Sequence, residues 1–338
     1  MANFPELHFL ERLLENLSSH ARVNSETYVD FAGKKFPIYS VVFGSKDPTA
    51  PTLALIGGVH GQEKIGSQVV LSYLEILTEL LHWDEITHKI LEKSRIVFLP
   101  IVNPIGMYLI QRTNANGVDI MRNSPITSNE ATTFLVGGQR ISRYLPWYQG
   151  PKGGPMEIES QALCSFIQRE VYPAKVSIAL DVHSGYGAVD RLWFLYAKTK
   201  KPYPELPEAY ALKVLLDQTY SNHVYRIEPS AQSYTISGDI WDYLYDEQKK
   251  SAYTKNMFMP FTLEMGSWLW LKKNPIQLFS AMGLFHPVHL HRHKRILRRH
   301  ITLLDFLHRA VISSERWAFL NEEEKNLLRK EAIEEWYS

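Results

Sequence analysis

Two histidines and one glutamate of this sequence have the types and the setting of a catalytic metal site. His60 and Glu63 stand three residues apart in GGVHGQEKIG, directly after the apolar segment PTLALI, and His183 ends a second apolar segment, VSIALDVH. An H-x-x-E pair alone is weak evidence, because it arises often by chance. Two imidazoles and a carboxylate, however, are a donor set that holds a catalytic zinc ion and leaves one coordination position open for water. The pattern therefore predicts a zinc site.

Five short apolar segments, with helical stretches between them, have to position these residues. Apolar runs predict buried strands over 52–58, 95–102, 176–183, 191–197 and 259–265, and helical periodicity predicts helices that include 5–20, 66–82 and 157–171. An alternating pattern that breaks at Gly33 predicts a hairpin over 27–44. This alternation is typical of an α/β fold. We expect a single domain over 1–338, with a mixed, mostly parallel central sheet flanked by helices and a helical C-terminal segment over about 267–338.

Further polar residues follow or end these predicted strands. Arg112 and Arg122 come after the second strand, and Glu264 lies on the fifth. Ligands of open α/β sheets bind outside the carboxyl ends of the strands. We therefore expect Arg112, Arg122 and Glu264 to converge with the predicted zinc ligands at one rim of the sheet.

Composition excludes several classes of function. The chain has 338 residues, of which 45% are hydrophobic and 22% are charged, and its formal net charge is +1. This balance gives no reason to expect a nucleic-acid partner or an anionic membrane. Cys164 is the only cysteine, which allows no intramolecular disulfide, and the N-terminal segment lacks the features of a signal peptide. We expect a cytoplasmic protein without a transmembrane helix, whose oligomeric state the sequence leaves open.

Four separated motifs occur in the order in which one enzyme family carries them. They are GGVHGQE, NPIGMYLIQRTNANGVDIMRN, DVHSG and FTLEMG, and they span residues 57–266. On these motifs the chain resembles the zinc carboxypeptidase superfamily, the family of carboxypeptidase A. The resemblance implies the family's fold, one Zn2+ per chain, and hydrolysis of the C-terminal peptide bond of a peptide substrate.

The resemblance also implies roles for the residues that chemistry singles out. His60, Glu63 and His183 match the zinc ligands. Glu264 matches the general acid/base, which takes a proton from water and returns it to the leaving amine. Arg112 matches the arginine that polarises the scissile carbonyl.

Substrate-binding residues follow from the same resemblance. Arg122 matches the arginine that holds the terminal carboxylate of the substrate. The segment WDYLYDE resembles the family's D-W-x-Y segment and points to Tyr245 as the mobile tyrosine, with Tyr243 as second choice. One departure is Met121, which stands where the family has an asparagine and whose thioether cannot donate to a carboxylate. Recognition of the substrate carboxylate as in the family then requires that Asn123 or another donor substitute for it.

Three functions are compatible with these residues. The first is a zinc metallocarboxypeptidase acting on peptides. The second is a zinc amidohydrolase that removes the acyl group from N-acyl amino acids, because GGVHGQE and LEMG also resemble the aspartoacylase and succinylglutamate desuccinylase branch. That branch carries a β-rich C-terminal domain, whereas the end of this chain is predicted to be helical, which favours the peptidase. The third, a non-enzymatic binding protein, is disfavoured because the complete chemical set is present.

Other features were weighed against simpler explanations. The Gly- and Pro-rich stretch 137–155 predicts a long loop in which the neighbouring Trp147 and Tyr148 could line a pocket, although ordinary packing is the commoner role. Asp181 could orient His183 as a hydrogen-bond acceptor. The segment HPVHLHRHKR (286–295) could bind metal, but its basic helical surroundings favour a solvated face.

Overall fold

The centre of the sheet is formed by three strands with no exposed residue. In the computed structural model every residue of β3 (Thr52–Gly57), β4 (Arg95–Leu99) and β5 (Val176–Ser184) is buried. Strands covered on both faces read as continuous apolar runs, as these segments do. The structure describes residues 4–17, 21–128, 130–279 and 283–338.

Eight strands form one mixed sheet in the order β1-β2-β4-β3-β5-β8-β6-β7. The remaining strands are β1 (Ala21–Phe31), β2 (Lys34–Gly44), β6 (Arg191–Phe194), β7 (Arg226–Pro229) and β8 (Met257–Met265). Strands β4, β3, β5 and β8 run parallel, whereas β2 and β6 pair antiparallel to their neighbours in this set. The carboxyl ends of β3, β5 and β8 therefore lie at the same edge of the sheet.

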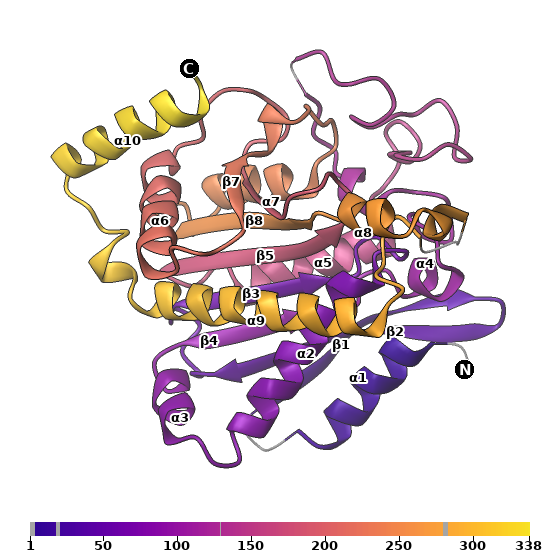
Figure 1. Cartoon of the computed structure of the whole chain (residues 1–338), viewed down its shortest axis with the longest axis horizontal. Coiled ribbons are helices and arrows are strands. Elements are labelled where there is room, and N and C mark those ends of the chain that lie inside the picture. The colour runs from indigo at the N-terminus through magenta and orange to yellow at the C-terminus, as the bar shows by residue number, and fades with distance from the viewer. Residues whose placement is uncertain (1–3, 18–20, 129, 280–282) are drawn as a thin grey trace.

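Helices cover both faces of this sheet (Figure 1). On one face α1 (Pro5–Glu15) packs on α2 (Lys64–Leu80), which packs with α9 (Leu290–Ile312) over β3 and β5. On the other face α5 (Ile158–Glu170) contacts β1 and β2, and α7 (Ile240–Lys250) contacts β8.

The remaining helices are α3 (Glu85–Leu91), α4 (Pro104–Leu109), α6 (Leu206–Thr219), α8 (Trp268–Lys273) and α10 (Glu322–Trp336). Single 3-10 turns span Ile120–Arg122 (η1), Ser230–Gln232 (η2), Pro275–Phe279 (η3) and Ser314–Arg316 (η4).

The predicted fold class is confirmed, and the differences lie at element ends and in short elements. The five predicted strands and the helices over 66–82 and 157–171 are all present, with bounds that move by at most a few residues. The predicted hairpin over 27–44 is longer, because β1 begins at Ala21, and its turn at Ala32 and Gly33 has positive φ at both residues. Residues 18–20 of the predicted N-terminal helix lie outside the described residues. No helix in the described part of the chain combines the length and apolarity needed to cross a bilayer.

Helix α9 carries two buried histidines that should make the fold sensitive to acid. His300 is fully buried, and His308 is 7% exposed with Nε2 3.0 Å from Ser94 Oγ. Burial lowers the pKa of each imidazole to about 4, although the nearby Asp190 carboxylate opposes this shift at His300. The unfolded chain takes up these protons at its ordinary pKa of about 6.5, whereas the folded chain does not until about pH 4. Stability from these groups is therefore complete above pH 6.5 and falls as the pH drops towards 4.

We predict that replacing His308 by glutamine flattens this acid dependence. Each histidine with a lowered pKa makes the free energy of unfolding fall by up to about 1.4 kcal/mol per pH unit in that window. Urea unfolding of the wild-type protein and of His308→Gln should show a smaller slope between pH 6.5 and 4 for the variant. Equal slopes for the two proteins would contradict the argument. A variant whose free energy of unfolding is lower by the same amount at every pH would have lost only packing.

Candidate active site

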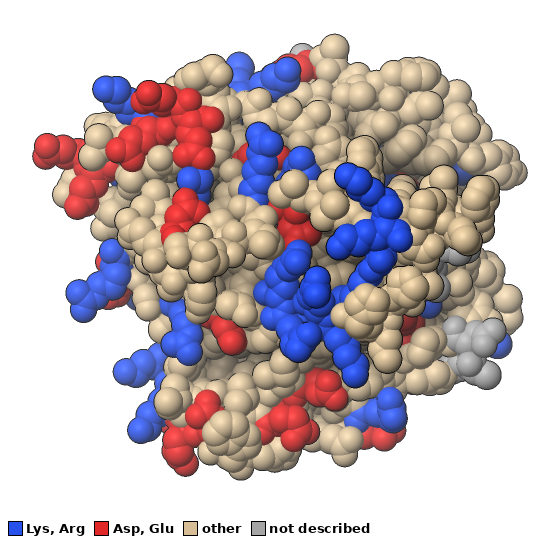
Figure 2. Space-filling model, in the orientation of Figure 1, with Lys and Arg blue, Asp and Glu red and all other residues tan. Residues whose placement is uncertain are grey.

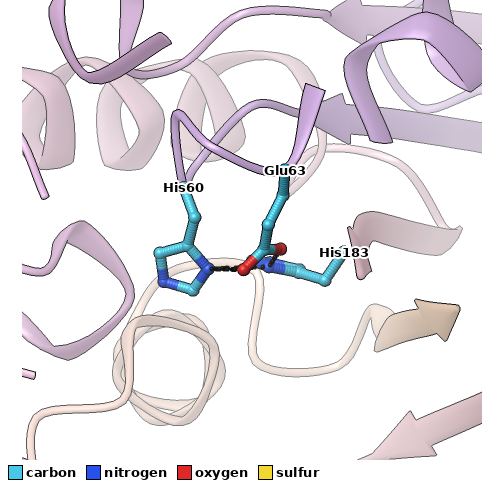
Figure 3. A group of neighbouring side chains, drawn as sticks. All are labelled: His60, Glu63 and His183. Carbon is cyan, nitrogen blue, oxygen red and sulfur yellow. Dashed lines mark hydrogen bonds and ion pairs between the residues drawn. The ribbon is translucent and has the colours of Figure 1, made fainter. Parts of the chain in front are cut away.

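The loop after β3 and the end of β5 bring the predicted metal ligands together. His60 Nδ1 lies 2.8 Å from Glu63 Oε1, and His183 Nδ1 lies 2.9 Å from Glu63 Oε2. The two Nδ1 atoms are 3.1 Å apart, and all three side chains are buried (Figure 3). Nitrogen and oxygen donors that point at one another inside the protein repel unless a proton or a cation lies between them. This donor set fits a divalent metal ion, and zinc in particular.

Glycines of the GGVHGQEKIG segment allow this loop its close packing. A Cβ atom on Gly61 would lie 1.9 Å from the carbonyl carbon of Gly106, and one on Gly66 would lie 2.1 Å from Val182 O. Any side chain at these positions would push the loop away from α4 or helix α2 away from β5. The glycines therefore hold the loop with His60 and Glu63 against the strand that carries His183.

Each imidazole has a carboxylate near its other nitrogen. His60 Nε2 lies 3.1 Å from Asp119 Oδ1, and His183 Nε2 lies 2.7 Å from Asp181 Oδ2. Such carboxylates fix the orientation of a metal-binding imidazole and make it a better ligand. Burial lowers the pKa of His183, but the carboxylates of Asp181 and Glu63 raise it by more. The pKa of His183 therefore lies well above its ordinary value. Asp181 thus takes the orienting position considered from the sequence, whereas Asp119 was missed, although it stands inside the quoted D-I-M-R-N run.

Glu264 reaches the same site from the neighbouring strand. In the parallel register of β5 and β8 it lies opposite His183, and its Oε1 accepts a hydrogen bond of 2.9 Å from the backbone N–H of Tyr186. Burial and the Glu63 carboxylate raise the pKa of Glu264 to about 8. A cation bound by the three ligands would offset the charge of Glu63 and lower this pKa. The side chain is placed to exchange protons with a molecule at the metal position.

Both predicted arginines border the site and share one carboxylate. Arg112 Nε donates to Asp119 Oδ2 over 2.8 Å, and its Nη1 lies 3.4 Å from Glu63 Oε1. Arg122 Nη1 donates to the same Asp119 oxygen over 3.2 Å, and its Nε donates to Val136 O over 2.9 Å. Burial raises the pKa of Asp119, but the arginines and His60 outweigh it, so the pKa lies well below the ordinary value. Asp119 is therefore a buried anion that positions two cations.

One cavity of about 500 Å³ joins these groups. It is bordered by the three predicted metal ligands, Arg112, Arg122, Glu264 and Met121. Much of its remaining lining is apolar and includes Trp193, Phe194, Leu195, Ile236, Trp241 and Pro260. Trp147 also lines the cavity, from the predicted long loop, with φ +63°. A cavity of this size suits a small ligand or the end of a chain.

Two of the predicted substrate-binding residues lie away from this cavity. Tyr245 is buried on α7, where its hydroxyl donates to Glu205 and its ring packs against Tyr203 at 5.8 Å. Asn123 is also occupied elsewhere, because its amide donates to Gln149 O over 2.9 Å and accepts from the backbone N–H of Glu157 over 2.6 Å. In this geometry neither Tyr245 nor Asn123 lines the cavity, and both residues hold neighbouring segments together.

A tyrosine outside the quoted motifs lines the cavity instead. Tyr234 lines the cavity and stacks edge-on against Trp193, with ring centroids 6.0 Å apart. Burial raises the pKa of Tyr234, while the positive charge of Arg122 opposes the shift. The signal for this residue in the sequence is weak, since Tyr234 lies seven residues before the tryptophan of WDYLYDE and in no D-W-x-Y pattern. Tyr243, the second choice, is likewise absent from the cavity lining.

Comparison with solved structures shows the same fold. Thrombin-activatable fibrinolysis inhibitor has a TM-score of 0.66 and 17% identity, and the match covers 91% of this chain and 73% of that one. The bovine protein, solved with tick carboxypeptidase inhibitor, has a TM-score of 0.65 and 16% identity, with 92% and 97% covered. Carboxypeptidase A of Helicoverpa armigera has a TM-score of 0.63 and 16% identity, with 91% and 72% covered.

Comparison of sequences identifies the family. Carboxypeptidase N catalytic chain of Mus musculus is 33% identical over 125 residues, which are 33% of this chain and 24% of that one. Carboxypeptidase 2 of Trichophyton equinum is 34% identical over 117 residues, covering 33% and 21%. The matched segments thus span about a quarter or less of these relatives. The zinc carboxypeptidase family profile, by contrast, matches residues 27–277, well over half of the chain. The chain belongs to the zinc carboxypeptidase family.

Proposed function

We propose that this enzyme removes the C-terminal residue of peptides with one zinc ion held by His60, Glu63 and His183. The observation that carries the proposal is that one cavity is lined by this donor set, a buried carboxylate and two arginines. When bound, zinc supplies Lewis-acid chemistry and lowers the pKa of a water molecule. The geometry of the protein groups supports the remaining roles.

Glu264 and Arg112 are proposed to carry out the chemistry on the protein side. Glu264 takes a proton from water and returns it to the nitrogen of the leaving residue, because it lies opposite His183 and its carboxylate faces the cavity. Arg112 opposes the negative charge that develops on the carbonyl oxygen. A single well-placed donor of this kind contributes roughly 3 to 4 kcal/mol to the stability of the transition state.

Arg122 and Tyr234 are proposed to bind the terminal carboxylate of the substrate. Met121, which replaces the asparagine of the family motif, lines the cavity but cannot donate a hydrogen bond. The Tyr234 hydroxyl beside Arg122 supplies the donor that Met121 lacks. Arg122 thus binds the substrate carboxylate as in the family, with Tyr234 as the second partner in place of the asparagine.

The apolar lining of the cavity favours an apolar side chain at the C-terminus of the substrate. Trp193, Ile236 and Trp241 offer apolar surface, whose burial against a substrate side chain stabilises binding. Asp239 also lines the cavity, but its carboxylate accepts hydrogen bonds of 2.9 Å from the backbone N–H groups of Trp241 and Asp242. Its charge serves to cap α7, so it is not expected to select a basic residue.

Replacing Glu264 by glutamine should abolish activity without removing the metal. The wild-type protein should bind one zinc per chain and release phenylalanine or leucine from blocked peptides with a free carboxylate. Glu264→Gln should keep the zinc and lose activity by a factor of roughly 100 or more, because glutamine cannot exchange the proton. Amino-acid release and zinc content are measured on the same preparations.

Matched substrates give this assay its controls. The same peptides with an amidated C-terminus should be poor substrates, because Arg122 then has no carboxylate to bind. Peptides ending in lysine should be slower than those ending in phenylalanine, and a reversed order would implicate Asp239. Cleavage of N-acyl amino acids alone, with no release from peptides, would overturn the carboxypeptidase proposal.

Matched variants of Tyr234 and Tyr245 test which tyrosine binds the substrate carboxylate. Tyr234→Phe removes one hydrogen bond to a charged group and should raise KM for free-carboxylate peptides roughly tenfold, with little change in kcat. Tyr245→Phe is the control, because it also removes one buried hydroxyl, but on α7 and away from the cavity. It should lower the melting temperature and leave KM unchanged. If the two variants show the same KM, Tyr234 does not bind the carboxylate.

A further inference from the structure

The part of the chain that follows Glu264 carries an unbalanced positive charge. No acidic residue lies between Glu264 and Asp305. The same stretch contains Lys272, Lys273, Arg292, Lys294, Arg295, Arg298 and Arg299. The formal net charge of the whole chain is only +1, so this charge is a local concentration. Figure 2 shows it as lysine and arginine side chains gathered over α8 and the N-terminal half of α9.

Part of this charge lines a second cavity rather than a flat surface. A cavity of about 510 Å³ lies between α8, the N-terminal half of α9 and the segments 188–190 and 265–266, and we call it the α8–α9 groove. Arg292, Arg295 and Arg299 line it from α9, at a spacing that puts them on one face of the helix. Lys273 lines it from α8, and Arg298 does not line it.

Protein groups offset only a part of the charge in the groove. Asp190 is the acidic residue among the lining residues, and it already pairs with Arg299 Nη1 at 2.7 Å and accepts the backbone N–H of Gly266 at 2.9 Å. Arg292 Nη1 donates to the carbonyl of Trp270 over 3.2 Å, which fixes its position without cancelling its charge. Within the described chain, neither Arg295 nor Lys273 forms an ion pair.

These contacts leave three cations without an acidic partner around a concave space, Arg292, Arg295 and Lys273, of which Arg292 is held by Trp270. Like charges held close together destabilise the folded protein unless an anion neutralises them. The planar guanidinium group binds phosphate and carboxylate oxygens with two parallel hydrogen bonds, and two such groups lie one helical turn apart on the groove wall. The volume matches that of small-ligand sites, whereas nucleic acids and membranes contact a more extended basic surface.

We propose that the α8–α9 groove binds a small anion with two or more phosphate or carboxylate groups. Arg292 and Arg295 hold the anion from α9, and Lys273 closes on it from α8. Arg299 lines the same space but is partly neutralised by Asp190. This site is separate from the cavity of the proposed zinc centre, and it does not depend on the peptidase proposal.

Calorimetric titration of the zinc-loaded full-length chain tests the proposal. Tripolyphosphate represents the phosphate source and tricarballylate the carboxylate source, and the zinc content is measured before and after to exclude metal removal. One saturable site per chain is expected, with an affinity that falls as salt is added. Exchanging both Arg292 and Arg295 for glutamine should weaken binding at least roughly tenfold. The matched control is Arg298→Gln, on the same helix but outside the groove, which should bind as the wild type does.

Each other outcome overturns the proposal. Absence of saturable binding to both anions would do so directly. Equal weakening by Arg298→Gln would show diffuse attraction to the basic helix. Unchanged binding by the double variant would place the anion elsewhere, for example between Arg112 and Arg122. Binding to phosphatidylserine vesicles or single-stranded DNA, but to neither small anion, would mean that these basic side chains bind a membrane or a nucleic acid over a surface larger than the groove. Melting temperatures of the variants confirm that the fold is kept.

Discussion

The buried carboxylate of Asp119 is the interaction on which the rest of the site depends. One of its oxygens accepts from His60 and from the backbone N–H of Met121, and the other accepts from Arg112 and Arg122. A charge that is fully buried is stable only when its partners are complete, and losing one partner of such a group costs about 3 to 5 kcal/mol. The positions of a metal ligand and of both arginines are therefore coupled through one residue.

The sheet makes this coupling possible by the way its strands are ordered. Because β3 and β5 are adjacent and parallel, the loop with His60 and the end of β5 with His183 meet at one edge. The next parallel strand, β8, adds Glu264 opposite His183. The strands thus position Glu264 and the predicted metal ligands. Segments without regular structure contribute other residues of the cavity lining, such as Trp147 and Tyr234.

This division explains which features could be predicted from the sequence. His60, Glu63, His183 and Glu264 adjoin apolar strands, and a buried strand leaves its end residues little freedom, so motif and strand pattern together located them. The sequence could not show that Tyr245 and Asn123 lie outside the cavity lining, because spacing alone does not tell which side of a helix or loop faces a cavity. Tyr234 was missed because its place depends on contacts with Trp193 and Arg122, which lie far from it in the sequence. The α8–α9 groove needed the structure, since a basic helix alone gives no concave surface.

The most direct test of this account compares Asp119→Asn with Asp181→Asn. Each variant removes the charge beside one metal-binding imidazole, but only Asp119 also holds Arg112 and Arg122. We expect both folded variants to lose roughly 10- to 100-fold in zinc affinity, measured by competition with a chelator. At saturating zinc, Asp119→Asn alone should raise KM for a free-carboxylate peptide. If Asp119→Asn folds and binds both zinc and peptide as the wild type does, or if the two variants behave alike, Asp119 does not couple the two parts of the site.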